Sequence, residues 1–240
     1  MNRGDVRALF AGLSVVPNTV AIASAITLTS VVPPAGRWMM PLGRTWSRWL
    51  LGAAGIRVHF EGLEHTRAAP ALLFMANHES VLDIPVVALA MPDSLRFIAK
   101  HSIQWIPFFG WAMKASGGCI FVDRGNREKA VVSLQLAAER IREGHCVLVF
   151  PEGTRSRDGR LGEFKKGPFH LAAEARVPIV PVAIQGTREL MPKRSLRIYA
   201  GDVRVRFGPP IPVTPEATPA TLAPQVRTAM LELLGQREAW

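Results

Sequence analysis

The sequence predicts an α/β fold with a central mixed sheet flanked by helices and preceded by a membrane-associated helical segment. From Ile56 onward, short apolar runs of strand length alternate with segments whose apolar residues follow helical spacing, which is typical of an α/β sheet. Before Ile56 the chain is apolar and rich in tryptophan. We therefore divide the 240 residues into a membrane-binding segment, 1–55, and a globular domain, 56–240, that can bury a substantial core.

The first predicted element is an apolar segment with no charged residue from position 8 to position 36. As an ideal helix, its central residues 13–32 would span about 30 Å, the thickness of a bilayer's hydrocarbon core. Pro17 is expected to interrupt this run, and the Pro-Pro pair after it to end it. Three structures fit this pattern: a spanning helix, a re-entrant or interfacial element, and a secretory signal with an A-x-A pattern at 23–25. The break at Pro17 disfavours the signal.

The next element combines tryptophan with arginine. Half of the six tryptophans of the chain and three arginines lie between positions 37 and 49. This composition is typical of a membrane interface, and the alternative is a core helix with a basic outer face. The arginines after residue 32 outnumber Arg3 and Arg7 before the apolar run. If the run spans a membrane, this bias places the main body on the cytoplasmic side.

Charge and cysteine content narrow the function classes. The formal net charge of +10 favours an anionic partner such as a membrane surface, nucleic acid or a phosphorylated substrate. A single tyrosine and the absence of a Lys/Arg-rich tail argue against a nucleic-acid partner. Cys119 and Cys146 both lie in apolar runs and form no metal-ligand spacing, so we expect a buried reduced pair and no metal site.

The main body contains a series of apolar runs that predict strands at 56–62, 71–76, 95–99, 119–123, 146–150 and 179–184. The first alternates apolar and polar residues like a half-buried strand, and the others resemble strands covered on both faces. Between the fourth and fifth runs, Asn126 and Gly144 are expected to bound a helix. Further strand is predicted within 195–208, then a proline-rich loop at 209–224 and a closing helix at 221–235.

The loop NHESVLD, residues 77–83, carries a histidine and an aspartate after a buried strand. Residues five apart share no helical face, so His78 and Asp83 cannot pair as helix neighbours. They can meet if His78 ends the strand, Ser80 caps a helix and Asp83 lies in its first turn. Asp83 would then hold one ring nitrogen while the other faces a substrate, as in a general-base dyad. The alternative is a polar turn; the zinc motif HExxH fails at Leu82.

Three further loops follow predicted strands. Arg124, after 119–123, is either a surface arginine or a phosphate-binding fork. In FPEGTR, residues 150–155, proline and glycine predict a turn from which a glutamate and an arginine project. In VPIVPV, residues 177–182, two prolines favour an edge strand or a bulge that shapes a pocket wall. The chain has no GxSxG, Walker A or GxGxxG motif.

Together these blocks resemble the four signature blocks of the glycerolipid acyltransferase family, and most closely its lysophosphatidate (1-acyl-sn-glycerol-3-phosphate) O-acyltransferases. The blocks NHESVLD, FVDR, FPEGTR and VPIVPV occur in the order and spacing of the family, within residues 77–182. Each block is weak alone, but four in order are specific. The resemblance implies the glycerolipid acyltransferase fold and an enzyme that acts on a membrane lipid.

The implied reaction transfers an acyl chain from a thioester of coenzyme A or acyl carrier protein to the free sn-2 hydroxyl of lysophosphatidate, giving phosphatidate. His78 would remove the hydroxyl proton, and Asp83 would fix and stabilise the imidazole. Lys100, Arg124 and Arg155 would bind the acceptor's phosphate. The remaining motif residues with positioning roles would be Asn77, Glu152, Gly153 and Thr154. Glu152 would orient Arg155 or the acceptor, and backbone N–H groups near Gly153 would stabilise the oxyanion. The thioester is a co-substrate, so no bound cofactor and no metal are implied.

Two alternatives remain at this point. The acceptor could be another lysolipid, such as a lyso-ornithine lipid, because motif blocks report the reaction better than the headgroup. In a different class, the chain could be a non-catalytic basic protein that binds the membrane surface. Either way, the apolar front end and the charge of +10 predict association with an anionic membrane, with the site facing the cytoplasm.

Overall fold

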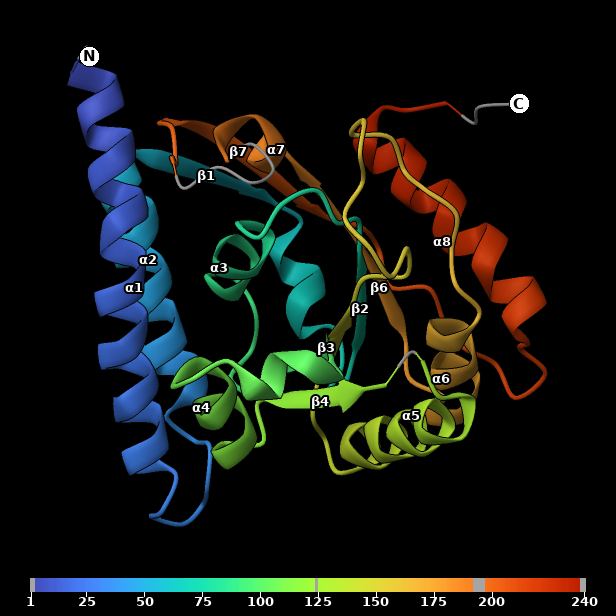
Figure 1. Ribbon diagram of the computed structural model, residues 1–240. Coiled ribbons are helices and arrows are strands. Elements are labelled where there is room, and N and C mark those ends of the chain that lie inside the picture. Colours follow the sequence, from blue (N-terminus) through green and yellow to red (C-terminus); the bar gives the residue numbers. More distant parts are fainter. Residues whose placement is uncertain (1–2, 124, 192–196, 238–240) are drawn as a thin grey trace.

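The structure is a computed structural model that describes residues 3–123, 125–191 and 197–237. In these residues a seven-stranded sheet lies between two groups of helices (Figure 1). The strands are β1 (Ile56–Glu61), β2 (Leu73–Ala76), β3 (Arg96–Lys100), β4 (Cys119–Val122), β5 (Val147–Val149), β6 (Ile179–Gln185) and β7 (Gly201–Phe207). The α-helices are α1 (Arg3–Thr29), α2 (Met39–Ala54), α3 (Asp83–Ala88), α4 (Phe109–Ala115), α5 (Arg127–Arg142), α6 (Gly167–Ala175), α7 (Thr187–Leu190) and α8 (Pro219–Leu234), and two 3₁₀ turns are η1 (Leu63–Arg67) and η2 (His101–Trp105).

The sheet has the order β1-β7-β6-β2-β5-β3-β4. The five strands from β6 to β4 run parallel to one another, while β7 is antiparallel to β6 and carries β1 beside it. This arrangement confirms the predicted mixed α/β sheet. Because parallel strands end at one edge of a sheet, the segments that follow β2, β5, β3 and β4 meet at the same carboxyl edge. Three of the four sequence blocks are therefore brought together by topology.

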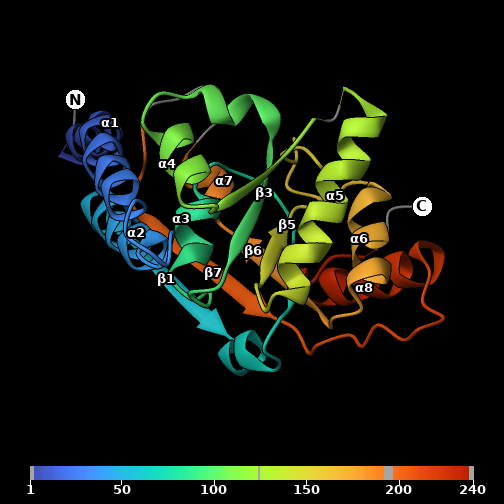
Figure 2. The ribbon, with the colours of Figure 1, turned by 90° about the horizontal axis from the view of Figure 1, so that it is seen from below.

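Strand β2 shows why the central strands are continuous apolar runs. Its side chains alternate between two cores: Phe74 packs with α1 to α4, and Leu73 and Met75 pack with α5, α6 and α8. Figure 2 shows these two helix groups on opposite faces of the sheet. All four residues of β2 are fully buried, as expected for a parallel strand covered on both sides.

Helices α1 and α2 pack against each other as a hairpin along one side of the molecule (Figure 1). Helix α1 continues through Pro17, so the predicted interruption there is wrong. A proline removes one helical hydrogen bond, and neighbouring helical turns together with packing against α2 maintain the rest. Trp46 donates from its indole N–H to the Thr19 hydroxyl at 3.0 Å, and Arg7 donates to the carbonyls of Gly52 and Ala53 at the end of α2.

Helix α1 is long and apolar enough to cross a membrane by length and composition. Within its stretch Asp5–Thr29, the most apolar window of 18 residues has a mean hydropathy of 1.7, and only 22% of that window is buried within the protein. Large apolar side chains on its outer face are exposed, including Phe10, Val16 and Leu28. The helix therefore presents to its surroundings a surface that the fold itself does not cover.

Pro181 lies within an interior strand, so the expectation of an edge strand at 177–182 is wrong, whereas the alternative expectation of a bulge agrees with the pairing beyond β7. Strand β6 pairs with β2 on one side and with β7 on the other. Pairing with β7 begins only at Val182, and beyond it Gly208 donates its N–H to the Pro181 carbonyl at 2.8 Å. Further along, Ile179 pairs with Ile211, so the neighbouring chain carries one extra residue opposite Pro181. The missing N–H of Pro181 therefore falls at a bulge, and the strand keeps its interior place.

The ends of α5, β7 and α8 agree with the predicted bounds in one case and differ from them in two. Asn126 caps α5 by accepting the N–H of Lys129 at 2.9 Å, and Gly144 follows the helix with φ of +90°, as predicted. Strand β7 begins at Gly201, so the described residues before it within 195–208 are not strand. Helix α8 begins at Pro219, inside the predicted proline-rich loop, because Thr218 supplies a capping box.

Candidate active site

The centre of the site is a contact between His78 and Asp83. Nδ1 of His78 lies 2.6 Å from Oδ2 of Asp83. His78 is the second residue after β2, and Asp83 is the first residue of α3, so the turn between strand and helix brings together two residues that are five positions apart. The His78 side chain is 19% exposed, whereas that of Asp83 is fully buried. Among the described residues, Nε2 of His78 has no hydrogen-bond partner, which leaves this nitrogen available to a substrate.

Asp83 accepts hydrogen bonds from three further groups. Its Oδ2 accepts the backbone N–H groups of Glu79 at 2.7 Å and Ser80 at 3.0 Å, and its Oδ1 accepts the hydroxyl of Thr187 at 2.5 Å. These donors compensate a buried carboxylate and fix its direction. Ser80 was expected to cap the helix, but the N-cap position is Leu82, and no side-chain cap is present. Asp83 itself binds the loop that precedes it.

The FPEGTR segment and the serine that follows it contact His78 from the other side. The ring of Phe150 stacks on that of His78, with centroids 4.0 Å apart and planes 16° apart. Ser156 donates its N–H to the carbonyl of His78 at 2.7 Å. Since β5 lies beside β2 in the sheet, the two loops fold against each other and leave the imidazole little rotational freedom.

Glu152 has a different contact from the one expected. It is buried, at 5% exposure, and its two oxygens accept the N–H groups of His78 at 3.0 Å and Gly162 at 2.9 Å. It therefore binds backbone instead of orienting Arg155. Burial raises its pKa above the ordinary value, while the bonds from His78 and Gly162 act in the opposite direction. Gly153, at φ of +74°, donates its N–H to the carbonyl of Phe150 within the turn.

Asn77 connects two strands at the base of the site. Its Nδ2 donates to the carbonyl of Ile184 at 2.8 Å, and its Oδ1 accepts the N–H of Ile184 at 2.7 Å. Backbone pairing between β2 and β6 ends at Ala76 and Val182. Beyond this point, the Asn77 side chain makes the hydrogen bonds to β6 that the backbone of β2 no longer makes. Asn77, the residue directly before His78, is thereby attached to β6, which fits the positioning role expected for it.

Glu79 is a second carboxyl group in the same loop. Burial, together with the charge of Asp83, raises its pKa to about 8, so it carries a proton at neutral pH. Its Oε1 accepts a hydrogen bond from Nδ2 of Asn77 at 3.3 Å. A neutral Glu79 adds no second negative charge beside Asp83, which leaves Asp83 as the charged partner of the histidine.

The residues expected to bind the phosphate, together with Thr154, lie at or near the carboxyl edge where the structure describes them. Lys100 is exposed at the end of β3, and Thr154 and Arg155 are exposed in the loop after β5. Arg124 lies outside the described residues. Two contributors were not predicted: Phe150, which stacks on the histidine, and Thr187, which comes from the start of α7 after β6. Nothing in the local sequence of Thr187 points to Asp83, because the contact depends on β6 lying beside β2.

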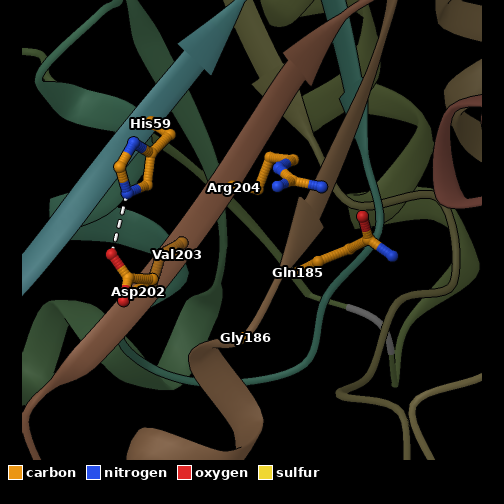
Figure 3. A pocket seen from close by; sticks show the side chains of 6 residues that line it. All are labelled: His59, Gln185, Gly186, Asp202, Val203 and Arg204. Carbon is orange, nitrogen blue, oxygen red and sulfur yellow. Dashed lines mark hydrogen bonds and ion pairs between the residues drawn. The ribbon is translucent and has the colours of Figure 1, made fainter.

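A separate surface depression of about 430 Å³ lies on the exposed side of β1 and β7 (Figure 3). It is lined by His59, Gln185, Gly186, Asp202, Val203 and Arg204. Its polar groups already have partners: Asp202 binds His59 at 2.8 Å and Arg57 at 2.8 and 2.9 Å. None of the four sequence blocks contributes to this lining. In the described residues, no three His, Cys, Asp or Glu side chains are grouped so that they could hold a metal ion.

Comparisons with known proteins agree with this geometry. A 1-acyl-sn-glycerol-3-phosphate acyltransferase of Brassica napus chloroplasts is 41% identical over 157 residues, which cover 65% of this chain and 45% of the relative. The human 1-acyl-sn-glycerol-3-phosphate acyltransferase alpha is 36% identical over 181 residues, which cover 74% of this chain and 63% of the relative. The chain thus spans less than two thirds of the length of these relatives.

A solved structure matches over nearly the whole chain. The crystal structure of the 1-acyl-sn-glycerophosphate acyltransferase PlsC from Thermotoga maritima superposes with a TM-score of 0.81 at 26% identity, covering 98% of this chain and 99% of that one. A family profile described as Acyltransferase matches residues 57–185, which include His78, Asp83 and the segment FPEGTR. Because this match covers more than half of the residues, the chain belongs to the acyltransferase family.

Proposed function

We propose that this protein transfers an acyl chain from an acyl thioester to the sn-2 hydroxyl of lysophosphatidate, giving phosphatidate for phospholipid synthesis. The observation that carries this proposal is the His78–Asp83 pair, in which Nδ1 is held at 2.6 Å and Nε2 is open. The names of the relatives support lysophosphatidate as the acceptor. The same geometry supports other lysolipid acceptors, which the assay below separates.

The reaction follows from the two ring nitrogens. Nε2 of His78 takes the proton of the acceptor hydroxyl as its oxygen attacks the thioester carbonyl. Asp83 stabilises the imidazolium that forms, and its bonds to Thr187 and the loop keep it oriented. When the tetrahedral intermediate collapses, the carbon–sulfur bond breaks and the thiolate recovers the proton from His78. No side-chain nucleophile is required, in accord with the absence of a GxSxG motif.

The phosphate of the acceptor would be bound by Arg124, Arg155 and Lys100. Arg155 is exposed in the loop after β5, and Lys100 is exposed at the end of β3. These two strands follow β2 in the sheet, so their positions at the carboxyl edge support the proposal. Guanidinium groups match phosphate in a bidentate manner, and a lysine adds a further charge. The donor would be either an acyl-coenzyme A or an acyl carrier protein, and both carry phosphate that a basic edge attracts.

Membrane attachment would be supplied by residues 1–55. The exposed apolar face of α1 and the net charge of +10 support binding to an anionic inner membrane, with the site on the cytoplasmic side. A lysophospholipid presents its headgroup at the membrane surface, so an enzyme held there meets the acceptor without extracting it into water.

The test is a thiol-release assay with purified protein, acyl-coenzyme A and lysophosphatidate in mixed micelles, with loaded acyl carrier protein as a second donor. We expect release by the wild type and a loss of about 10³-fold in His78→Ala. Unchanged secondary structure by circular dichroism would show that the variant folds. Equal rates in both proteins would refute the proposal. Faster turnover of lyso-ornithine lipid than of lysophosphatidate would assign the other acceptor and remove the phosphate role of Arg155.

A further inference from the structure

A cluster of exposed apolar side chains lies outside the site and outside residues 1–55. It is formed by Trp105, Ile106, Phe108 and Trp111, which are 71%, 48%, 40% and 53% exposed. We call it the η2–α4 patch, because it runs from the end of η2 into α4. Single exposed apolar residues are ordinary on a protein surface, but three aromatic rings within seven positions of one another are not.

The backbone of the patch is held in an unfavourable conformation that presents these rings. Phe108 has φ of +60° and ψ of −62°, and the N–H of Phe109 donates to the Pro107 carbonyl at 2.7 Å. This is the strained form of the γ-turn, which a non-glycine residue rarely adopts. Gly110 packs against the carbonyls of Ile103 and Gln104 so closely that a side chain would not fit. The patch is therefore a compact turn with a fixed shape.

The position of the patch connects the two regions that the proposed function requires. Residue Lys100, at the carboxyl edge, directly precedes η2. At the other end, α4 packs on α1, and Ser116 after it touches Gly36 in the turn between α1 and α2. That turn exposes Val31, at 80%. Exposed apolar side chains thus occur both in the turn of the helical hairpin and in the η2–α4 patch, and the patch begins five residues after Lys100 at the carboxyl edge.

Charge around the patch identifies the occupant. Lys100 and Lys114 flank it and are both exposed, and from 96 to 122 the chain has no acidic residue. Tryptophan rings beside lysines match the boundary between acyl chains and anionic headgroups, where an indole ring is both apolar and able to donate. A protein partner that covered only the aromatic rings would leave the two lysines without a complementary charge.

We propose that the η2–α4 patch inserts into the headgroup region of an anionic bilayer as a second contact, separate from α1, and sets the distance of the carboxyl edge from the membrane surface. This rests on the proposed function only in that the membrane is the source of the acceptor. With α1 alone, the protein could rotate about the helix axis; a second contact beside the site fixes the edge toward the lipid.

The test is an environment-sensitive fluorophore on Trp105→Cys, in the full chain with Cys119→Ala and Cys146→Ala. The matched control is Val132→Cys on α5, which is 63% exposed on the opposite side of the sheet. With vesicles of phosphatidylcholine and phosphatidylglycerol, we expect a blue shift and quenching by brominated acyl chains at position 105 only. A water-like emission at position 105 in protein that sediments with the vesicles would overturn the proposal. A blue-shifted emission before vesicles are added, in protein of dimer mass, would instead assign the patch to a second copy.

An activity measurement complements the label. Trp105→Ser with Trp111→Ser should lower thiol release on vesicles about tenfold, since a buried aromatic ring contributes at least that factor to partitioning. Thiol release on a short-chain, water-soluble lysophosphatidate should be unchanged. Phe108→Gly removes a ring and introduces glycine, which tolerates the positive φ at this position, so the variant should fold and show a smaller loss of thiol release on vesicles.

Loss of activity on both substrates would overturn the membrane role. Absence of thiol release in the wild type, with the position-105 label in the bilayer, would refute the proposed function and leave the patch intact.

Discussion

Two histidine–aspartate pairs in this molecule have similar distances and different surroundings. Nδ1 of His78 lies 2.6 Å from Asp83, and Nε2 of His59 lies 2.8 Å from Asp202 (Figure 3). In the first pair the carboxylate is fully buried, and in the second both side chains are more than half exposed. Distance alone therefore does not identify a catalytic pair.

What differs is how each carboxylate is used. Asp83 accepts two backbone N–H groups and the Thr187 hydroxyl, all of which orient it toward one histidine. Asp202 is shared with Arg57, whose guanidinium is the main reason why the pKa of Asp202 is lowered. The exposed pair joins neighbouring strands at the surface, where water screens it. The buried pair lies at the carboxyl edge, where a substrate can reach the open nitrogen.

The largest expected difference is between the two aspartates. Asp83→Asn should lower kcat on the order of 10³-fold, because an amide cannot stabilise the imidazolium and can favour the wrong tautomer. Asp202→Asn should leave kcat within a factor of about two, since it touches no part of the site. The measurement is the rate of thiol release by each variant compared with that of the wild type. Losses of similar size would mean that burial and orientation do not distinguish the pairs.

Thr187 tests whether the surroundings of Asp83 matter beyond its charge. Thr187→Val keeps the shape but removes the hydroxyl donor, so kcat should fall about tenfold while KM stays constant. Thr187→Ser retains a donor and should restore most of the rate. A variant whose KM rises while kcat is preserved would show a role in substrate binding instead of positioning.

Glu79 provides a test through pH and stability. Its pKa is about 8 in the folded protein against an ordinary value of 4.5. Between these values the folded state holds more protons than the unfolded state, so the free energy of unfolding falls as pH rises. Glu79→Gln cannot ionise and should be the more stable protein at pH 8, on the order of 2 kcal/mol, with no difference near pH 4. If Glu79→Gln and the wild type had the same melting temperature at pH 8 as well as near pH 4, the raised pKa would be contradicted.

The smallest expected effect is that of His59→Ala. The His59 side chain is exposed, and its partner Asp202 remains paired with Arg57 in the variant. Neither the melting temperature nor kcat should therefore change measurably. This variant is the matched control for His78→Ala, since both remove a histidine beside an aspartate. A clear loss of thiol release in His59→Ala would move the site, or part of it, to the depression in Figure 3.

The sequence predicted the parts of the site that depend on local order along the chain. His78 and Asp83 could be paired because a strand-to-helix crossing brings residues five apart together, and Asn126 could be placed because a helix cap is local. Thr187 and the bonds of Glu152 to backbone could not be predicted, because they depend on which strands become neighbours. The sequence of one loop does not show which residues of another loop contact it until the order of the strands in the sheet is known.

Two errors have the same origin. Pro17 and Pro181 were treated by their local preference alone, as a helix interruption and as a sign of an edge strand or a bulge, and the interruption and the edge strand were wrong. Helix α1 continues because packing against α2 and the remaining turns outweigh one missing bond. Strand β6 is interior because its missing donor lies at a bulge, where the neighbouring chain carries one extra residue. In both cases tertiary contacts decide, and these are not encoded within a few residues of the proline.

The pairing of β1 with β7 has a consequence for synthesis of the chain. Arg57 and Asp202, paired across these strands, are 145 positions apart. During translation α1 and α2 leave the ribosome long before β7 exists, so the apolar hairpin can reach a membrane while β1 still lacks its neighbour. The contact between Thr187 and Asp83 also forms late, since it requires β6. Under the proposed function, the protein would therefore be anchored first and become active only when nearly all of its chain has been made.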